Sequence, residues 1–263
     1  MFKKRFYYLL KIQYLGFRFH GWQKQPDTLT LERMMERTLA YVLGRKNFKY
    51  IAAGRTDAKV SAHCTYVELF LDDAPLDLTT FVHEFNKNLP QDIKLLSVRE
   101  VDERFNIIQH PKIKEYIYFF SFGQKNHPFC APFMVNLFED LDIQLMQEAA
   151  NHFVGTHDFR NYSYKPTPQT QTVMEVLTCE IVNNTLVTAS FFPEDSYLLR
   201  VRGEGFKRHQ IRLMMGALID VGRHALSLDD LINSIDGKKA FTLTHIAQAS
   251  GLMLHDMELK DFD

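Results

Sequence analysis

The chain has 263 residues, of which 46% are apolar and 24% are charged, and its formal net charge is −1. This composition excludes a disordered chain and fits one large folded domain or two smaller ones. No apolar run approaches the ~20 residues that cross a bilayer. The apolar patch near the N-terminus spans about five residues, fewer than the ~7–15 of a signal-peptide core. We therefore expect a cytoplasmic protein that does not associate with membranes.

Cysteine and histidine are too scattered to suggest a metal centre. Cys64, Cys130 and Cys179 form no CxxC pair, and the eleven histidines form no HExxH. This pattern argues against a disulfide framework and against a zinc site of thiolates. We expect no metal and no cofactor, and a metal site built from distant residues stays open as the weaker alternative.

The charges are unevenly distributed. The first 50 residues hold eleven Lys and Arg against three Asp and Glu, a local charge of +8. Such asymmetry can give a nearly neutral protein a basic face, which an RNA backbone would bind. A solvated lysine-rich surface explains the charge count equally well.

The first half of the chain alternates strand and helix patterns. Aromatic and β-branched residues predict a strand at 6–14, and glycines and Pro26 then mark a long loop. An apolar stripe predicts a helix that Thr30 caps and Gly44 ends. Further elements are expected as strands at 50–55, 65–71 and 93–101 and a helix at 79–88. The order β–α–β–β–α–β is typical of a ferredoxin-like domain.

The second half shows a similar mixture after a linker at 105–114. We expect strands at 115–123, 173–182, 185–192 and 197–206, and helices at 142–154, 206–221 and 228–235. The fold class is therefore α+β, with an N-terminal subdomain at 1–106 and a C-terminal subdomain at 107–263. We expect two ferredoxin-like (RRM-like) halves joined into one continuous antiparallel sheet, with helices on one face. The other face would form a cleft between the halves, suited to a long polar ligand.

The stretch AAGRTDAKVSAH places Arg55 and Asp57 directly after a short strand. Aspartate after a strand is often only a turn residue. Loops on a rigid sheet also carry catalytic residues, and one carboxylate can serve as nucleophile, general base or charge stabiliser. The residues alone leave both interpretations open.

Two further stretches are candidates for nucleic-acid contacts. GEGFKRHQIRLMMG places Lys207, Arg208, His209 and Arg212 in the first turns of the expected helix, where cations oppose the helix dipole unless an anion binds there. In KEYIYFF, alternation places Tyr116 and two further aromatics on one face, as core or as a base-stacking platform. The only tryptophan, in HGWQKQP, is more typical of a loop anchor than of a ligand contact.

Together these stretches resemble the tRNA pseudouridine synthases of the TruA family. GRTDAKVSA is similar to that family's GRTDxGVHA, and YLGFRFHGWQKQ to its YDGxxFxGWQxQ. NKNLPQDIKLLSV, KEYIYFF, GFKRHQIRLMMG and AQASGLMLHDMEL resemble its other motifs, in the family's order and over nearly the whole chain. The sequence departs from the family pattern at Leu15, Lys59, Ser61 and His245, and at Gln169 and Gln171, where the family often has an arginine. A glycine in place of Lys59 would imply a tight backbone or a close approach to the substrate.

The resemblance implies an isomerase that converts uridine to pseudouridine in tRNA, with positions 38 to 40 of the anticodon stem-loop as the default target. It implies that Asp57 is the catalytic residue, that Arg55 holds the flipped nucleotide and that Tyr116 contacts the base. Arg212 would pair with the aspartate. Asp57 would either attack C1′ or remove a proton from C2′, and both routes remain open. The resemblance also implies a cytoplasmic homodimer that binds tRNA.

Two alternatives make different predictions. One is an RNA-binding paralogue with an altered target or without activity, which would bind RNA without isomerising the usual uridines. The changes at Lys59 and Ser61 suggest this alternative. A metal-dependent hydrolase built on Asp57 and distant histidines would lose its activity with a chelator.

Overall fold

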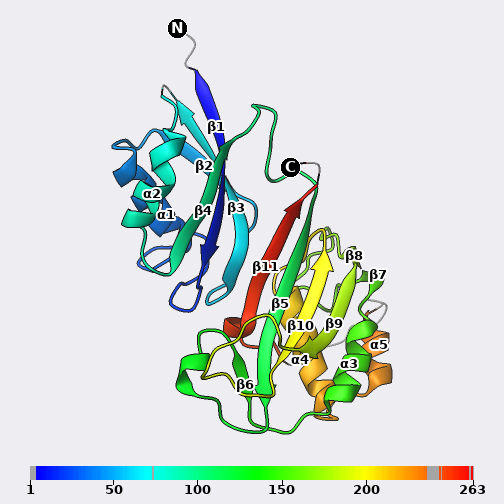
Figure 1. Ribbon diagram of the computed structural model, residues 1–263. Coiled ribbons are helices and arrows are strands. Elements are labelled where there is room, and N and C mark those ends of the chain that lie inside the picture. Colours follow the sequence, from blue (N-terminus) through cyan, green and yellow to red (C-terminus); the bar gives the residue numbers. More distant parts are fainter. Residues whose placement is uncertain (1–3, 73, 236–242, 244, 261, 263) are drawn as a thin grey trace. The chain divides into compact units, whose positions relative to one another are not determined.

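The computed structural model describes residues 4–72, 74–235, 243, 245–260 and 262. By their contacts, these residues fall into two compact units (Figure 1). Unit 1 extends to Lys112 and also includes the chain from Leu254 onward, whereas unit 2 spans Ile113–Met253. The functional division into subdomains 1–106 and 107–263 stays a prediction.

Unit 1 has the element order that the sequence predicts for its first half. Its elements are β1 (Arg5–Tyr14), α1 (Leu31–Val42), β2 (Phe48–Ala52), β3 (Ser61–Asp72), α2 (Leu78–Asn88), β4 (Ile93–Glu100) and most of β11 (Leu252–Leu259). Within this unit the strand order is β4–β1–β3–β11, and β2 also pairs with β3. The helices α1 and α2 lie side by side on one face of the sheet (Figure 1).

The register of β1 against β3 explains why the helices pack on that face. Tyr8, Leu10 and Ile12 lie on one face of β1 and are fully buried. Their partners on β3 (Leu69, Val67 and Thr65) are buried as well. Because side chains alternate between the two faces of a strand, these residues form one continuous apolar surface under the helices.

The helix α1 follows the predicted signals closely. The Thr30 side chain caps it by accepting a hydrogen bond from the Arg33 backbone N–H at 3.4 Å. Leu31 and Leu39 of its apolar stripe are fully buried. Gly44 follows the helix with φ +62°, the left-handed conformation that ends many helices.

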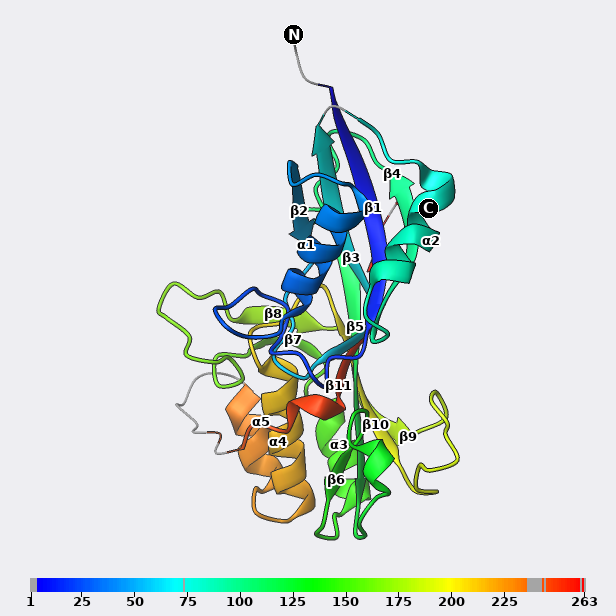
Figure 2. The ribbon, with the colours of Figure 1, turned by 90° about the vertical axis from the view of Figure 1, so that its left-hand side faces the viewer.

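Unit 2 also combines strands with helices. Its elements are β5 (Lys112–Phe122, whose first residue belongs to unit 1), a 3₁₀ turn (Pro128–Cys130), β6 (Val135–Leu137), α3 (Ile143–Asn151), β7 (Gly155–Asp158), β8 (Val173–Val176), β9 (Thr178–Asn183), β10 (Tyr197–Gly203), α4 (Gln210–Gly222), α5 (Leu228–Ile235) and a second 3₁₀ turn (Ala249–Gly251). The strand order is β5–β10–β9, with β6 parallel to β5, and β7 and β8 form a separate antiparallel pair. The three helices pack on one another (Figure 2). The predicted α+β class is therefore confirmed.

The strand predicted at 173–182 is divided into β8 and β9, because β8 pairs with β7 whereas β9 pairs with β10. The structure corrects two further elements of unit 2. The predicted strand at 185–192 is a loop, because the Asn184 side chain bonds to the backbone of Val187 in both directions and turns the chain. Phe191 and Phe192 of this loop pack on Ile117, so their apolar character reflects burial of the sheet rather than strand pairing.

The second correction concerns the start of α4. We expected this helix to begin at residue 206, but it begins at Gln210. His209 precedes it with φ +62°, a left-handed conformation that a right-handed helix cannot contain. Lys207 and Arg208 therefore lie in the loop before the helix, and Arg212 lies in its first turn.

Candidate active site

The candidate catalytic residues Arg55 and Asp57 lie in the 53–60 loop, which connects β2 to β3. The backbone of this loop is bonded to the 15–23 segment that follows β1. The Trp22 N–H donates to the Thr56 carbonyl at 3.0 Å, and the Lys59 N–H donates to the Phe19 carbonyl at 3.0 Å. Trp22 itself is 3% exposed, so it anchors its segment, as the sequence suggests.

Two glycines allow the 15–23 segment to lie directly against the 53–60 loop. A Cβ atom on Gly16 would lie 2.0 Å from the Val60 carbonyl oxygen. A Cβ atom on Gly21, which has φ +89°, would lie 2.8 Å from the Thr56 carbonyl oxygen. Both contacts are with backbone atoms, so the two motifs YLGFRFHGWQ and GRTD form one structural unit.

Asp57 forms a turn with its backbone, and its side chain is partly exposed to solvent. Its carbonyl accepts a hydrogen bond from the Val60 N–H at 3.2 Å, which closes a turn over residues 57–60. Asp57 is half-buried, whereas Arg55 is exposed and donates from Nη1 to the Gln23 Oε1 at 2.9 Å. The turn interpretation and the catalytic interpretation are therefore compatible, because the turn fixes the backbone from which the carboxylate projects.

Lys59 confirms the tight backbone that the family glycine implies. It has φ +68°, a conformation that glycine adopts freely and a side chain opposes. Its ammonium lies 5.7 Å from the centre of the Phe17 ring. The other departure, Ser61, supports the loop, because its hydroxyl accepts a hydrogen bond from the Gly16 N–H at 2.9 Å.

In unit 2, the aromatic residues of β5 divide into core and surface. Tyr118 and Phe120 are fully buried and belong to the core. Among the three aromatics of KEYIYFF on this face, Tyr116 alone is half-buried, and its ring meets Phe206 edge to face with centroids 5.4 Å apart. A base-stacking role is thus restricted to Tyr116.

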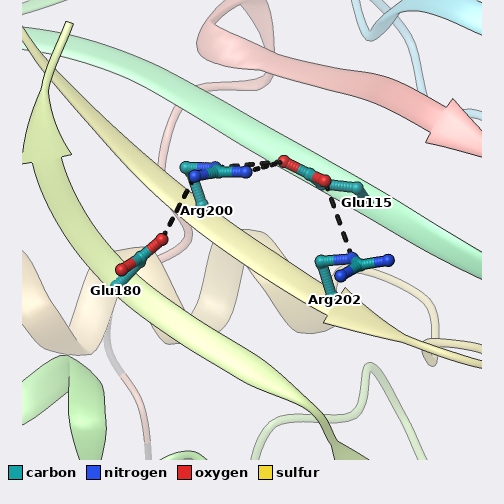
Figure 3. A network of polar contacts seen from close by, with 4 residues as sticks. All are labelled: Glu115, Glu180, Arg200 and Arg202. Atoms are coloured by element: carbon teal, nitrogen blue, oxygen red, sulfur yellow. Dashed lines mark hydrogen bonds and ion pairs between the residues drawn. The ribbon is translucent and has the colours of Figure 1, made fainter.

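A charged network lies on the opposite face of β5, beside Tyr116 (Figure 3). Glu115 accepts hydrogen bonds from Arg200 Nε at 3.0 Å and Nη2 at 2.9 Å, and its second oxygen lies 3.7 Å from Arg202 Nε. Arg200 also bonds to Glu180 on β9 at 3.3 Å. The sequence analysis did not find this network. The only sequence pattern that indicates it is the alternation of charged and apolar residues along three strands. That pattern can be interpreted only when the pairing of the strands is known.

Arg212 is held by the chain that follows α5. Its Nε donates to the Ala247 carbonyl at 2.7 Å, and the Ala247 N–H donates to the Arg212 carbonyl at 3.0 Å. A Cβ atom on Gly216 would lie 2.0 Å from the His245 carbonyl oxygen, so this glycine permits the close contact. Burial raises the pKa of Tyr118, and the positive charge of Arg212 opposes that shift.

The structure thus places two of the predicted residues in each unit. Arg55 and Asp57 share one loop of unit 1, and Tyr116 and Arg212 belong to unit 2. Their union in one active site and their individual roles stay predictions.

The basic character of the first 50 residues is partly neutralised within unit 1. Arg5 pairs with Asp72 at 2.8 Å, Lys24 pairs with Glu36 at 2.5 Å, and Arg18 pairs with Asp92. The local charge of +8 therefore overstates the positive field of this segment.

The described residues contain neither a metal-binding group of side chains nor a membrane-spanning helix. In that part of the chain, no three His, Cys, Asp or Glu side chains are grouped closely enough to hold a metal ion. None of its helices is long and apolar enough to span a membrane.

The chain is similar to known proteins of one family. A family model described as tRNA pseudouridine synthase matches residues 149–259. The chain is 32% identical to tRNA pseudouridine synthase A 2 of Bacillus cereus (strain ATCC 10987 / NRS 248), over 95% of this chain and 98% of the relative. It is 33% identical to tRNA pseudouridine synthase A of Pelobacter propionicus, over 94% and 97% of the two chains. The corresponding protein of Chlamydia pneumoniae is 32% identical over 94% and 89%.

Proposed function

The chain belongs to the tRNA pseudouridine synthase family, and from this premise we propose that it isomerises uridine at positions 38 to 40 of the tRNA anticodon stem-loop. The observation that carries the proposal is the 53–60 loop, which holds Asp57 in a turn bonded to the 15–23 segment. A loop fixed on both sides can present a carboxylate in one orientation, as catalysis requires.

The reaction exchanges one bond of the nucleoside for another. The N1–C1′ bond breaks, the uracil turns, and C5 bonds to C1′, while C5 loses its proton to solvent and N1 gains one from solvent. No redox change and no activated donor is involved. Asp57 either forms a covalent bond to C1′ or takes a proton from C2′, and both routes lead to the same product.

The other residues would position the substrate. The target uridine must first leave its stack, which costs a few kcal/mol. Arg55 is exposed beside Asp57 and would hold the flipped nucleotide by its charge. Tyr116 is a half-buried aromatic of β5 and would stack on the uracil. Arg212, fixed by Ala247, would pair with the Asp57 carboxylate and keep it ionised near the polyanion.

The partner of this protein would be tRNA, bound by a homodimer in the cytoplasm. Binding that rests on Lys and Arg contacts with phosphates releases counterions, so the affinity for tRNA should fall steeply with salt. The homodimer and the location are inferred from the family resemblance.

A second candidate function is RNA binding without isomerisation. The strained backbone at Lys59 favours it, because a cation with φ +68° stands two residues from the proposed catalyst. The support that Ser61 gives to Gly16 argues the other way, since it keeps the loop in place.

The test is tritium release from tRNA transcripts labelled with [5-³H]uridine, in the presence of EDTA. Wild type should release tritium, and Asp57→Ala should release none because no carboxylate reaches the sugar. Glu103→Ala, which removes an exposed carboxylate of the same unit, is the matched control and should react like wild type. Binding of tRNA without release by wild type would establish the RNA-binding alternative, and mapping the modified positions tests the anticodon assignment.

A further inference from the structure

Two cations pack on the ring of Tyr164, in the loop between β7 and β8 of unit 2. The Arg208 guanidinium lies 4.9 Å from the centre of the Tyr164 ring, and the Lys165 ammonium lies 5.4 Å from it. The His209 ring is 4.6 Å away. The Tyr164 N–H donates to the Arg208 carbonyl at 3.1 Å and so joins this loop to the one before α4.

In the described part of the chain, neither these two cations nor the adjacent Lys207 has a carboxylate partner. Within the described residues, Lys165, Lys207 and Arg208 form no ion pair, and each is exposed or half-buried. This differs from Arg5, Arg18 and Lys24 of unit 1, which pair with acids. Like charges held together without counter-charges repel one another, so such a cluster favours the binding of an anion.

The backbone under this cluster is strained. Lys165 has φ +48° and His209 has φ +62°, a conformation that costs free energy in a residue with a side chain. Glycine would adopt the same backbone at less cost. The chain nevertheless has Lys165 and His209 at these positions, which indicates that their side chains contribute to function.

The position of the cluster identifies its anion. Phe206 contacts the Tyr116 ring, and Arg208 lies two residues further, at most about 7 Å along the chain. A nucleotide stacked on Tyr116 would therefore have its neighbouring phosphates near Lys207 and Arg208.

We propose that Lys165 and Arg208, which pack on Tyr164, and the adjacent Lys207 bind the RNA phosphates that flank the target uridine. The inference rests on the proposed function, because it takes Tyr116 as the residue that stacks on the target base. The site would fix the register of the RNA and carry no base specificity, as phosphate contacts do.

The test measures the affinity of the full chain for a tRNA transcript between roughly 50 and 200 mM salt. Lys165→Gln and Arg208→Gln should each weaken binding about fivefold to tenfold, the effect of losing one charge-assisted contact. Each should also lower the slope of log affinity against log salt by about one. Lys125→Gln, which removes an exposed cation elsewhere in unit 2, is the matched control and should leave the slope unchanged.

Lys165→Gly separates binding from folding. It removes the cation and relieves the backbone, so it should unfold at the wild-type temperature or above it and still bind tRNA more weakly. Unchanged salt slopes in both glutamine variants would overturn the proposal. The binding measurement does not depend on catalysis, so it tests this inference even if the wild type releases no tritium. An absence of tritium release would count against the proposed function alone.

Discussion

Replacing Gly16 with alanine tests whether the 15–23 segment positions the catalytic loop. The new Cβ would lie 2.0 Å from the Val60 carbonyl oxygen, and real Cβ contacts essentially never fall below 3.0 Å. The two backbones must therefore separate by about 1 Å, and a displacement of that size can lower a catalysed rate about 100-fold. Overpacking of this kind also costs about 1–3 kcal/mol of folding free energy.

Single-turnover tritium release at saturating enzyme measures the rate, and thermal unfolding measures the stability. Gly44→Ala is the matched control, because Gly44 has φ +62° and no atom within 4 Å of its would-be Cβ. It should lose about 1–2 kcal/mol of stability through the backbone alone and keep the wild-type rate. If folded Gly16→Ala reacts at the wild-type rate, the contact does not position Asp57 and the reasoning fails.

Other predictions concern stability. Lys59→Gly should raise the free energy of unfolding by about 1 kcal/mol in urea titrations, because glycine adopts the φ of +68° without strain; an equal gain in Lys59→Ala would show that the backbone is not the cause. Burial raises the pKa of Glu68 above 4.5, so the folded protein should lose stability as the pH rises from 4.5 through that raised pKa. Glu68→Gln should flatten this decline and unfold at a higher temperature than wild type at neutral pH. A wild-type decline that persists in Glu68→Gln would assign it to another group. Tyr118→Phe should cost about 1 kcal/mol in the same titrations, because it removes the hydrogen bond from the hydroxyl to the Gln248 carbonyl at 2.9 Å.

Local signals predicted the parts of the fold that depend on neighbours in the chain. The helix α1 follows from its own stripe, its Thr30 cap and Gly44, and α5 has the predicted bounds of Leu228–Ile235. The motif that contains Asp57 was visible for the same reason, since its residues are consecutive.

Features that depend on distant residues escaped sequence reasoning. The apolar 185–192 segment looked like a strand because both a paired strand and a covering loop bury their side chains. The network around Glu115 needs the pairing of β5 with β10, which no local pattern specifies. In the sequence, the two glycines of the 15–23 segment indicate only a loop. The contact with the 53–60 loop shows that they permit close packing of the two backbones.

The return of the chain to unit 1 at β11 affects the order in which the protein can assemble. On the ribosome, residues 254–259 emerge only after the whole of unit 2, although β11 lies next to β3. The ring of His63 on β3 stacks on that of His255 on β11. Until β11 is made, this part of β3 lacks its neighbouring strand and has an open edge. In many proteins the N-terminal domain folds completely before the next domain is made. Unit 1 cannot do so, because it contains residues that follow unit 2 in the chain. The strand that follows the proposed catalytic loop therefore pairs with β11 only after unit 2 has been synthesised.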